Sequence, residues 1–114
     1  MKEKIKKARM ISKITAQVTE YYLENGAENF HIKIDKENNE YTIHTFGYMD
    51  LSPKKVMEIK KVMSIHHDLE YGEYWELIGE GEDTDELILI ARVCDSVDMN
   101  YENKIFELTL KKKF

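Results

Sequence analysis

The chain has 114 residues, of which 42% are hydrophobic and 34% are charged, as expected for one folded domain rather than a disordered tail. Its net charge of −5 argues against a general nucleic-acid binder, whose affinity comes from cations that meet phosphates. The single cysteine, Cys94, permits no internal disulfide. The longest apolar run in the second half, 87–91, is far shorter than the roughly 20 residues that span a bilayer. We therefore expect one cytoplasmic domain that binds neither nucleic acid nor a membrane.

The N-terminal segment has the pattern of an amphipathic helix. Apolar residues recur at steps of three and four positions from Ile5 to Tyr21, which places them on one face of a helix. Asn25-Gly26 follows, and glycine readily adopts the left-handed backbone that ends many helices. The spacing predicts a helix over 4–24.

A β-hairpin is predicted next. Apolar and polar residues alternate over 29–35 and again over 40–46, as in two half-buried antiparallel strands. A four-residue loop at 36–39 would gather the apolar side chains on one face and set His31 opposite His44 on the other. Two histidines are too few for a zinc site, so we interpret this pair as ordinary solvated cross-strand residues and predict no metal site.

The second half contains a further helix and a further hairpin. Ser52-Pro53 suits a helix start, because serine caps free backbone N–H groups and proline fits the first turn, and the pattern predicts a helix over 53–67. Alternation predicts strands over 97–101 and 104–111. The segment 84–95 is ambiguous, because its apolar run fits a buried strand and its acidic start fits a helix.

One stretch carries a family resemblance. The sequence Glu86-Leu-Ile-Leu-Ile-Ala-Arg-Val-Cys-Asp-Ser-Val-Asp98, followed by a terminal hairpin, and the helix ending in Glu20-Tyr-Tyr-Leu-Glu24 resemble the histidine-kinase-like ATPase (GHKL) superfamily, in particular its small bacterial anti-sigma-factor kinases. The resemblance favours a helix at 84–95. It implies an α+β fold, a two-layer sandwich with helices packed on one face of a mixed, mostly antiparallel sheet.

The nucleotide motifs of that family are degenerate here. The family's first helix carries an Asn that helps to hold magnesium, four residues after a Glu; if Glu20 matches that Glu, Glu24 stands in place of the Asn. The family's Asp-x-Gly-x-Gly loop is replaced by 46–50, which contains a single glycine. Gly79 and Gly81 match the later glycine box only among acidic neighbours, which repel a triphosphate.

The resulting expectation is a non-catalytic regulatory module on a degenerate ATPase scaffold, with a protein partner or a second copy of itself, no catalytic residues and no cofactor. The aromatic cluster Tyr71, Tyr74 and Trp75, beside glycine and acids, fits either packing at the edge of the core or an exposed interface anchor. The partner-binding candidates are Tyr74, Trp75, Glu80, Glu82 and Asp83.

Two alternatives remain open. The first is a diverged ATP-binding kinase of the anti-sigma-factor type, using ATP and magnesium at Glu20, Glu24, Gly79 and Gly81. The second drops the resemblance: 86–94 becomes a strand, and the chain is an unrelated small α+β domain that binds an unknown ligand. A shift of the melting temperature with MgATP would distinguish the first alternative from a pure protein-binding module.

Overall fold

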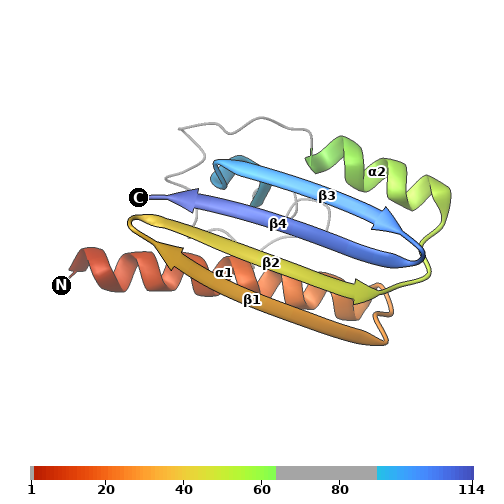
Figure 1. Cartoon of the computed structure of the whole chain (residues 1–114), viewed down its shortest axis with the longest axis horizontal. Helices are drawn as coiled ribbons and strands as arrows, with labels where there is room; N and C mark the ends of the chain where they lie inside the picture. Colours follow the sequence, from red (N-terminus) through yellow and green to blue (C-terminus); the bar gives the residue numbers. More distant parts are fainter. Residues whose placement is uncertain (1, 64–89) are drawn as a thin grey trace.

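The computed structural model describes residues 2–63 and 90–114. Within them, a helix and a hairpin are followed by a second helix and a second hairpin (Figure 1). The elements are α1 (Lys2–Glu24), β1 (Asn29–Glu37), β2 (Glu40–Tyr48), α2 (Pro53–Met63), β3 (Ser96–Glu102) and β4 (Ile105–Lys113).

The four strands form one antiparallel sheet in the order β1-β2-β4-β3. The two hairpins therefore lie side by side, with β2 and β4 in the centre and β1 and β3 outside them. Helix α1 runs along one face of this sheet (Figure 1). The expected α+β fold is confirmed, and the sheet formed by the described strands is wholly antiparallel.

The end of α1 and the start of α2 are each fixed by a capping hydrogen bond. Helix α1 closes with a hydrogen bond from the Ala27 N–H to the Tyr22 carbonyl oxygen at 3.0 Å, which Gly26 permits by its φ of 79°. Helix α2 begins at Pro53, and the Ser52 hydroxyl oxygen accepts the N–H of Lys55 at 3.1 Å. The predicted end of this second helix, 64–67, lies outside the described residues.

The first hairpin is tighter than the sequence pattern predicted. Its turn is the two residues Asn38-Asn39, because Glu37 pairs directly with Glu40, and Asn38 tolerates the left-handed φ of 57° that the turn requires. The predicted four-residue loop was therefore wrong, as was the pairing of His31 with His44. His31 lies opposite Phe46 instead. A shift of two residues keeps every side chain on its predicted face, since the side-chain period of a strand is two.

The second hairpin holds the connection between β2 and α2. Its two turn residues, Asn103 and Lys104, both have a positive φ, and the Lys104 carbonyl oxygen accepts the N–H of Met49 at 2.8 Å. The Tyr101 hydroxyl donates to the Met49 carbonyl oxygen at 2.8 Å and accepts the Leu51 N–H at 3.0 Å. These bonds join segments about 50 residues apart in the chain.

The hydrophobic core lies between the sheet and the helical layer. Helix α1 contributes one buried stripe, and the inward side chains of β2 and β4 form the opposite wall. Among residues 2–63 and 90–114, the buried apolar residues are Met10, Ile11, Ile14, Val18, Tyr21, Tyr22, Ile43, Met49, Ile59, Ile90, Ala91, Val93, Cys94, Phe106, Leu108 and Leu110.

The described end of the ambiguous segment is helical. Residues 90–93 have helical geometry, and the Cys94 N–H donates to the Ile90 carbonyl oxygen at 3.0 Å. The rest of that segment, 84–89, lies outside the described residues. Among the helices in the described part of the chain, none is long and apolar enough to cross a membrane.

Candidate functional site

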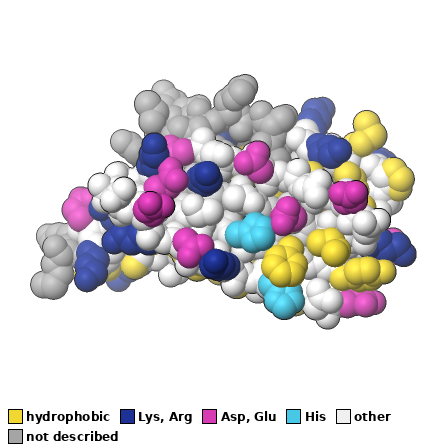
Figure 2. Space-filling model, in the orientation of Figure 1, with side chains coloured by type: hydrophobic (Ala, Val, Ile, Leu, Met, Phe, Trp, Pro, Cys, Tyr) yellow, Lys and Arg dark blue, Asp and Glu magenta, His cyan; other side chains and the backbone are white. Residues whose placement is uncertain are grey.

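The two faces of the sheet differ in composition. Helix α1 lies against one face, where the inward residues of β2 and β4 are buried. The opposite face, which we call the open face, carries mostly charged and polar side chains. Figure 2 shows one exception, a group of hydrophobic side chains gathered beside two histidines. This group is the most distinctive feature of the open face.

The group consists of Phe46, Tyr48 and Ile105, which we call the apolar patch. Their exposed fractions are 38%, 36% and 45%. Tyr48 and Ile105 lie directly opposite each other on β2 and β4, and Phe46 is two residues along β2 from Tyr48, on the same face. Strand alternation alone brings the three side chains together. They form a continuous hydrophobic surface at one end of the sheet.

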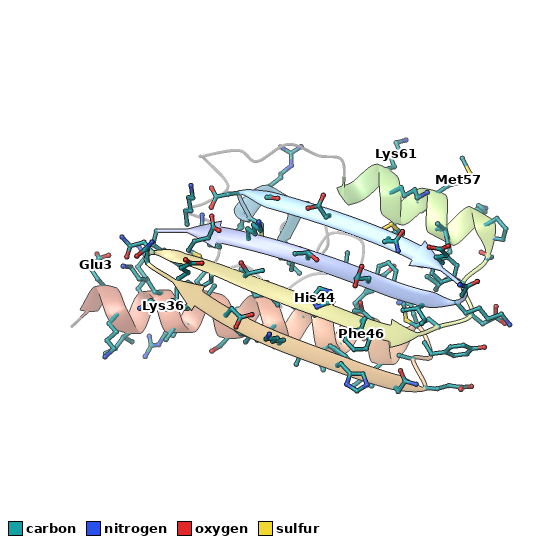
Figure 3. The ribbon with its side chains drawn as sticks, in the orientation of Figure 1. Glu3, Lys36, His44, Phe46, Met57 and Lys61 are labelled. Atoms are coloured by element: carbon teal, nitrogen blue, oxygen red, sulfur yellow. The ribbon has the colours of Figure 1, made fainter. Side chains whose placement is uncertain are left out.

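Two histidines border the apolar patch. The His31 ring stacks on Phe46 with 4.6 Å between ring centroids and 12° between planes, and the His44 ring lies 5.9 Å from the same phenyl group. Figure 3 labels His44 and Phe46 on β2. The His31 contact restricts the rotation of the Phe46 side chain, so a partner that contacts Phe46 would order fewer side-chain rotamers on binding.

His44 is also fixed from the neighbouring strand. Its Nε2 lies 2.8 Å from an Oε2 carboxylate oxygen of Glu107 on β4, and the two side chains are 36% and 40% exposed. This pair orients the imidazole ring on the surface beside the patch. In the described part of the chain, no group of three or more His, Cys, Asp or Glu side chains is placed to hold a metal ion.

A second feature lies at the opposite end of the same sheet. A shallow polar recess of about 410 Å³ forms where the β1–β2 turn meets the end of β4. It is lined by Glu37, Asn38, Asn39, Glu40, Lys113 and Phe114. The Lys113 ammonium lies 3.9 Å from the Glu40 carboxylate, so the recess already contains an ion pair, and Phe114 is the one large apolar side chain among its lining residues.

The buried titratable groups have structural roles. Burial raises the pKa of the Cys94 thiol to about 12, which keeps it protonated and a poor nucleophile at neutral pH. Burial likewise raises the pKa of Tyr22 above its usual range. The Tyr22 hydroxyl donates to the Phe106 carbonyl oxygen and shares a hydrogen bond with the Thr45 hydroxyl, both at 2.9 Å. This network anchors α1 to the two central strands.

The residues expected for nucleotide binding are only partly described. Glu20 and Glu24 lie on α1 with exposed side chains, and Glu20 accepts a hydrogen bond from the Gln17 amide at 3.3 Å. Gly79 and Gly81 lie outside the described residues. The same holds for the partner-binding candidates Tyr74, Trp75, Glu80, Glu82 and Asp83.

The apolar patch was not among the residues singled out from the sequence. A signal for it exists, because Phe46 and Tyr48 share the strand parity of His44, and so belong to the face predicted to be solvated. Contiguous apolar side chains on an otherwise solvated face are a common mark of interaction surfaces. Ile105 joins them only because β4 pairs with β2, a long-range contact that belongs to the tertiary structure.

Comparison with known proteins adds no relative: no family model matches the chain, and no curated protein matches it.

Proposed function

We propose that this protein is a non-enzymatic binding module that docks another protein on the open face of its sheet, through the apolar patch. The observation that carries the proposal is the clustering of Phe46, Tyr48 and Ile105, each more than a third exposed, on a face where polar side chains are otherwise the rule. Aromatic side chains bury a large area at low entropic cost, and they dominate the energetics of many interfaces.

The charges around the apolar patch specify the kind of partner. Glu107 lies opposite Phe46, and Glu102 lies opposite Ile105 on β3, so carboxylates adjoin the patch on two strands. The whole chain carries a net charge of −5. A partner that inserts an apolar side chain and surrounds it with Lys or Arg would match this surface in both shape and sign.

The same geometry argues against an active site at this position. The apolar patch and the His44–Glu107 pair lie on an open strand surface rather than in an enclosed cleft, where the low dielectric would strengthen catalytic electrostatics. The proposal thus retains the protein-binding role expected from the sequence and places it on the central strands.

The test is affinity capture with matched variants. Wild-type protein, Phe46→Ala/Ile105→Ala and Thr109→Ala would be immobilised and exposed to extract from cells that make the protein, and retained proteins would be quantified by mass spectrometry. Thr109 lies on the same face of β4, away from the patch. Each partner candidate would then be purified and titrated.

We expect a partner that the wild type and Thr109→Ala retain equally and that Phe46→Ala/Ile105→Ala loses. Loss of a central anchor should raise Kd by about 30-fold. Glu102→Lys should also raise Kd, and by a larger factor at low salt than at high salt. If the partners retained are the same for all variants, or if the wild type retains none, the proposal is wrong.

A further inference from the structure

The outer edge of β1 offers a second surface, which adjoins the apolar patch where His31 stacks on Phe46. Strand β1 is nine residues long and pairs only with β2 among the described strands. Its inward-facing Ile32 and Ile34 remain 42% and 48% exposed, although the equivalent residues of the central strands are buried. A long edge strand with exposed apolar side chains is a template for pairing with another strand.

The tight hairpin determines which backbone groups point away from β2. In a hairpin closed by a two-residue turn, the residues that flank the turn exchange hydrogen bonds, and the pattern alternates along the ladder. Glu37, Asp35 and Lys33 therefore direct their N–H and C=O groups toward β2. Ile34 and Ile32 direct theirs to the outer edge, as do the other even-numbered residues of β1.

We propose that two copies of this chain associate through antiparallel pairing of their β1 strands, with the two-fold axis at Ile34, to join the described strands of both copies into one continuous sheet. A symmetric pair must match even-numbered residues with even-numbered residues, because only these have outward backbone groups. The axis must then lie where one residue of β1 faces the same residue of the second copy. The possible axis positions differ in which charged side chains they bring together.

Charge complementarity selects the axis. With the axis at Ile34, Lys33 lies opposite Asp35 of the second copy and Asp35 lies opposite its Lys33. These two side chains are already 3.7 Å apart within one chain and are 74% and 62% exposed. Four charges of alternating sign would then meet on the open face. An axis at Lys33 would set lysine against lysine, and an axis at Asp35 would set carboxylate against carboxylate, which is destabilising.

The remaining contacts of this register are also compatible. Ile34 meets its own copy on the inward face, which removes two half-exposed isoleucines from water. His31 lies opposite Glu37 of the second copy, on the same face as the lysine and aspartate. Lys36 lies opposite Ile32, and its ammonium is held 5.8 Å from the centre of the Tyr41 ring within its own chain, so its methylene groups are free to cover the isoleucine.

The test is a charge-swap series on the purified full-length chain, followed by sedimentation equilibrium. Lys33→Glu replaces two attractions by two repulsions, and so does Asp35→Lys. Each substitution alone should weaken the dimer by roughly tenfold to a hundredfold. The combination Lys33→Glu/Asp35→Lys restores both attractions and should restore dimerisation. A mixture of the two single variants should form heterodimers, although neither variant pairs well with itself.

Three controls keep the result interpretable. Lys111→Glu makes the same charge change on β4 and should leave the association unchanged. Circular dichroism and thermal melts establish that each variant is folded, and Ile34→Lys provides a second disruption that places two ammonium groups at the axis. Phe46→Ala/Ile105→Ala should dimerise like the wild type. Sedimentation thus tests the β1 pairing, and partner capture separately tests docking on the apolar patch.

The opposite results would overturn the proposal. A wild-type chain that stays monomeric throughout the concentration series has no such interface. A dimer indifferent to Lys33→Glu and Asp35→Lys uses another surface. A dimer that the single substitutions weaken, but that Lys33→Glu/Asp35→Lys does not restore, would show that Lys33 and Asp35 do not face each other across the interface, and the axis at Ile34 would be wrong.

Discussion

The Tyr22 network gives the sharpest test of how α1 is attached to the sheet. Tyr22 is fully buried, and its ring stacks on Phe30 with 4.4 Å between centroids. Its hydroxyl bonds to the Phe106 carbonyl oxygen and to the Thr45 hydroxyl, each at 2.9 Å. Tyr22→Phe keeps the ring and its packing and deletes only the hydroxyl group. The substitution therefore isolates the two hydrogen bonds.

The size of the effect follows from the number of bonds. Each buried neutral hydrogen bond contributes about 0.5–1.5 kcal/mol net, so Tyr22→Phe should lower the free energy of unfolding by about 2 kcal/mol. Thr45 retains a longer bond to the Leu108 carbonyl oxygen, at 3.4 Å, and so is not left wholly unpaired. Tyr22→Phe/Thr45→Val removes both hydroxyl groups and should cost less than the sum of the single substitutions, by about 1 kcal/mol.

Urea unfolding followed by circular dichroism measures these differences. A loss of about 2 kcal/mol would lower the midpoint by roughly 1–2 M, with little change in slope. Tyr48→Phe is the matched control, because Tyr48 lies on the open face and the loss of its hydroxyl group should change stability by less than about 0.5 kcal/mol. A Tyr22→Phe variant as stable as Tyr48→Phe, or costs that simply add in the double variant, would refute the claim that this network anchors the helix.

Three further predictions concern a close contact, a buried thiol and the nucleotide alternative. Gly47→Ala should destabilise the fold by about 1–3 kcal/mol, measurable by urea unfolding, because a Cβ there would lie 2.5 Å from the Asn29 carbonyl oxygen; an unchanged midpoint would mean that β1 shifts freely. Burial raises the pKa of Cys94 from 9.0 to about 12, so its contribution to stability should hold below pH 9 and decline as the pH rises toward 12, since the unfolded thiol loses its proton first. At pH 8 the thiolate fraction, and with it the alkylation rate of the folded protein, should be roughly a thousandfold below that of the unfolded chain; equal rates would show that the thiol is accessible. Calorimetric titration with ATP and Mg²⁺ should give no heat of binding, because acidic Glu24 replaces the asparagine that the ATPase pattern requires if Glu20 matches its glutamate; micromolar binding abolished by Glu20→Gln would instead support the kinase alternative.

Local patterns were sufficient for the element order but not for how the strands meet. The three-and-four spacing before Asn25 marks a helix, and Ser52-Pro53 marks the start of another, because caps and periodicity depend on neighbouring residues alone. The first hairpin was assigned the correct faces with the wrong turn. A four-residue loop and a two-residue turn bury the same side chains, so hydrophobicity cannot separate them. The left-handed φ of Asn38 is typical of the tight two-residue turn, and it appears only in the folded structure.

The candidate site was accessible to sequence reasoning only in part. Phe46 and Tyr48 lie on the polar parity of their strand, which is visible in the sequence. Their union with Ile105, 57 positions beyond Tyr48, is not visible there, because it arises where β4 pairs with β2. The partner-binding role of Tyr74 and Trp75 stays a prediction, since both lie outside the described residues.

By itself, the sequence determined that this is an α+β chain in which an amphipathic helix precedes a first hairpin and further helical sequence precedes a second, because periodicity and capping act over a few residues. It also determined which side chains of each strand share a face, since that depends only on the alternation along the strand. Only the tertiary structure decided that the two hairpins join through β2 and β4. This pairing leaves β1 at an edge of the sheet with exposed isoleucines, and it assembles the apolar patch on the open face. Strand order depends on contacts between residues more than 50 positions apart, and no local preference encodes them.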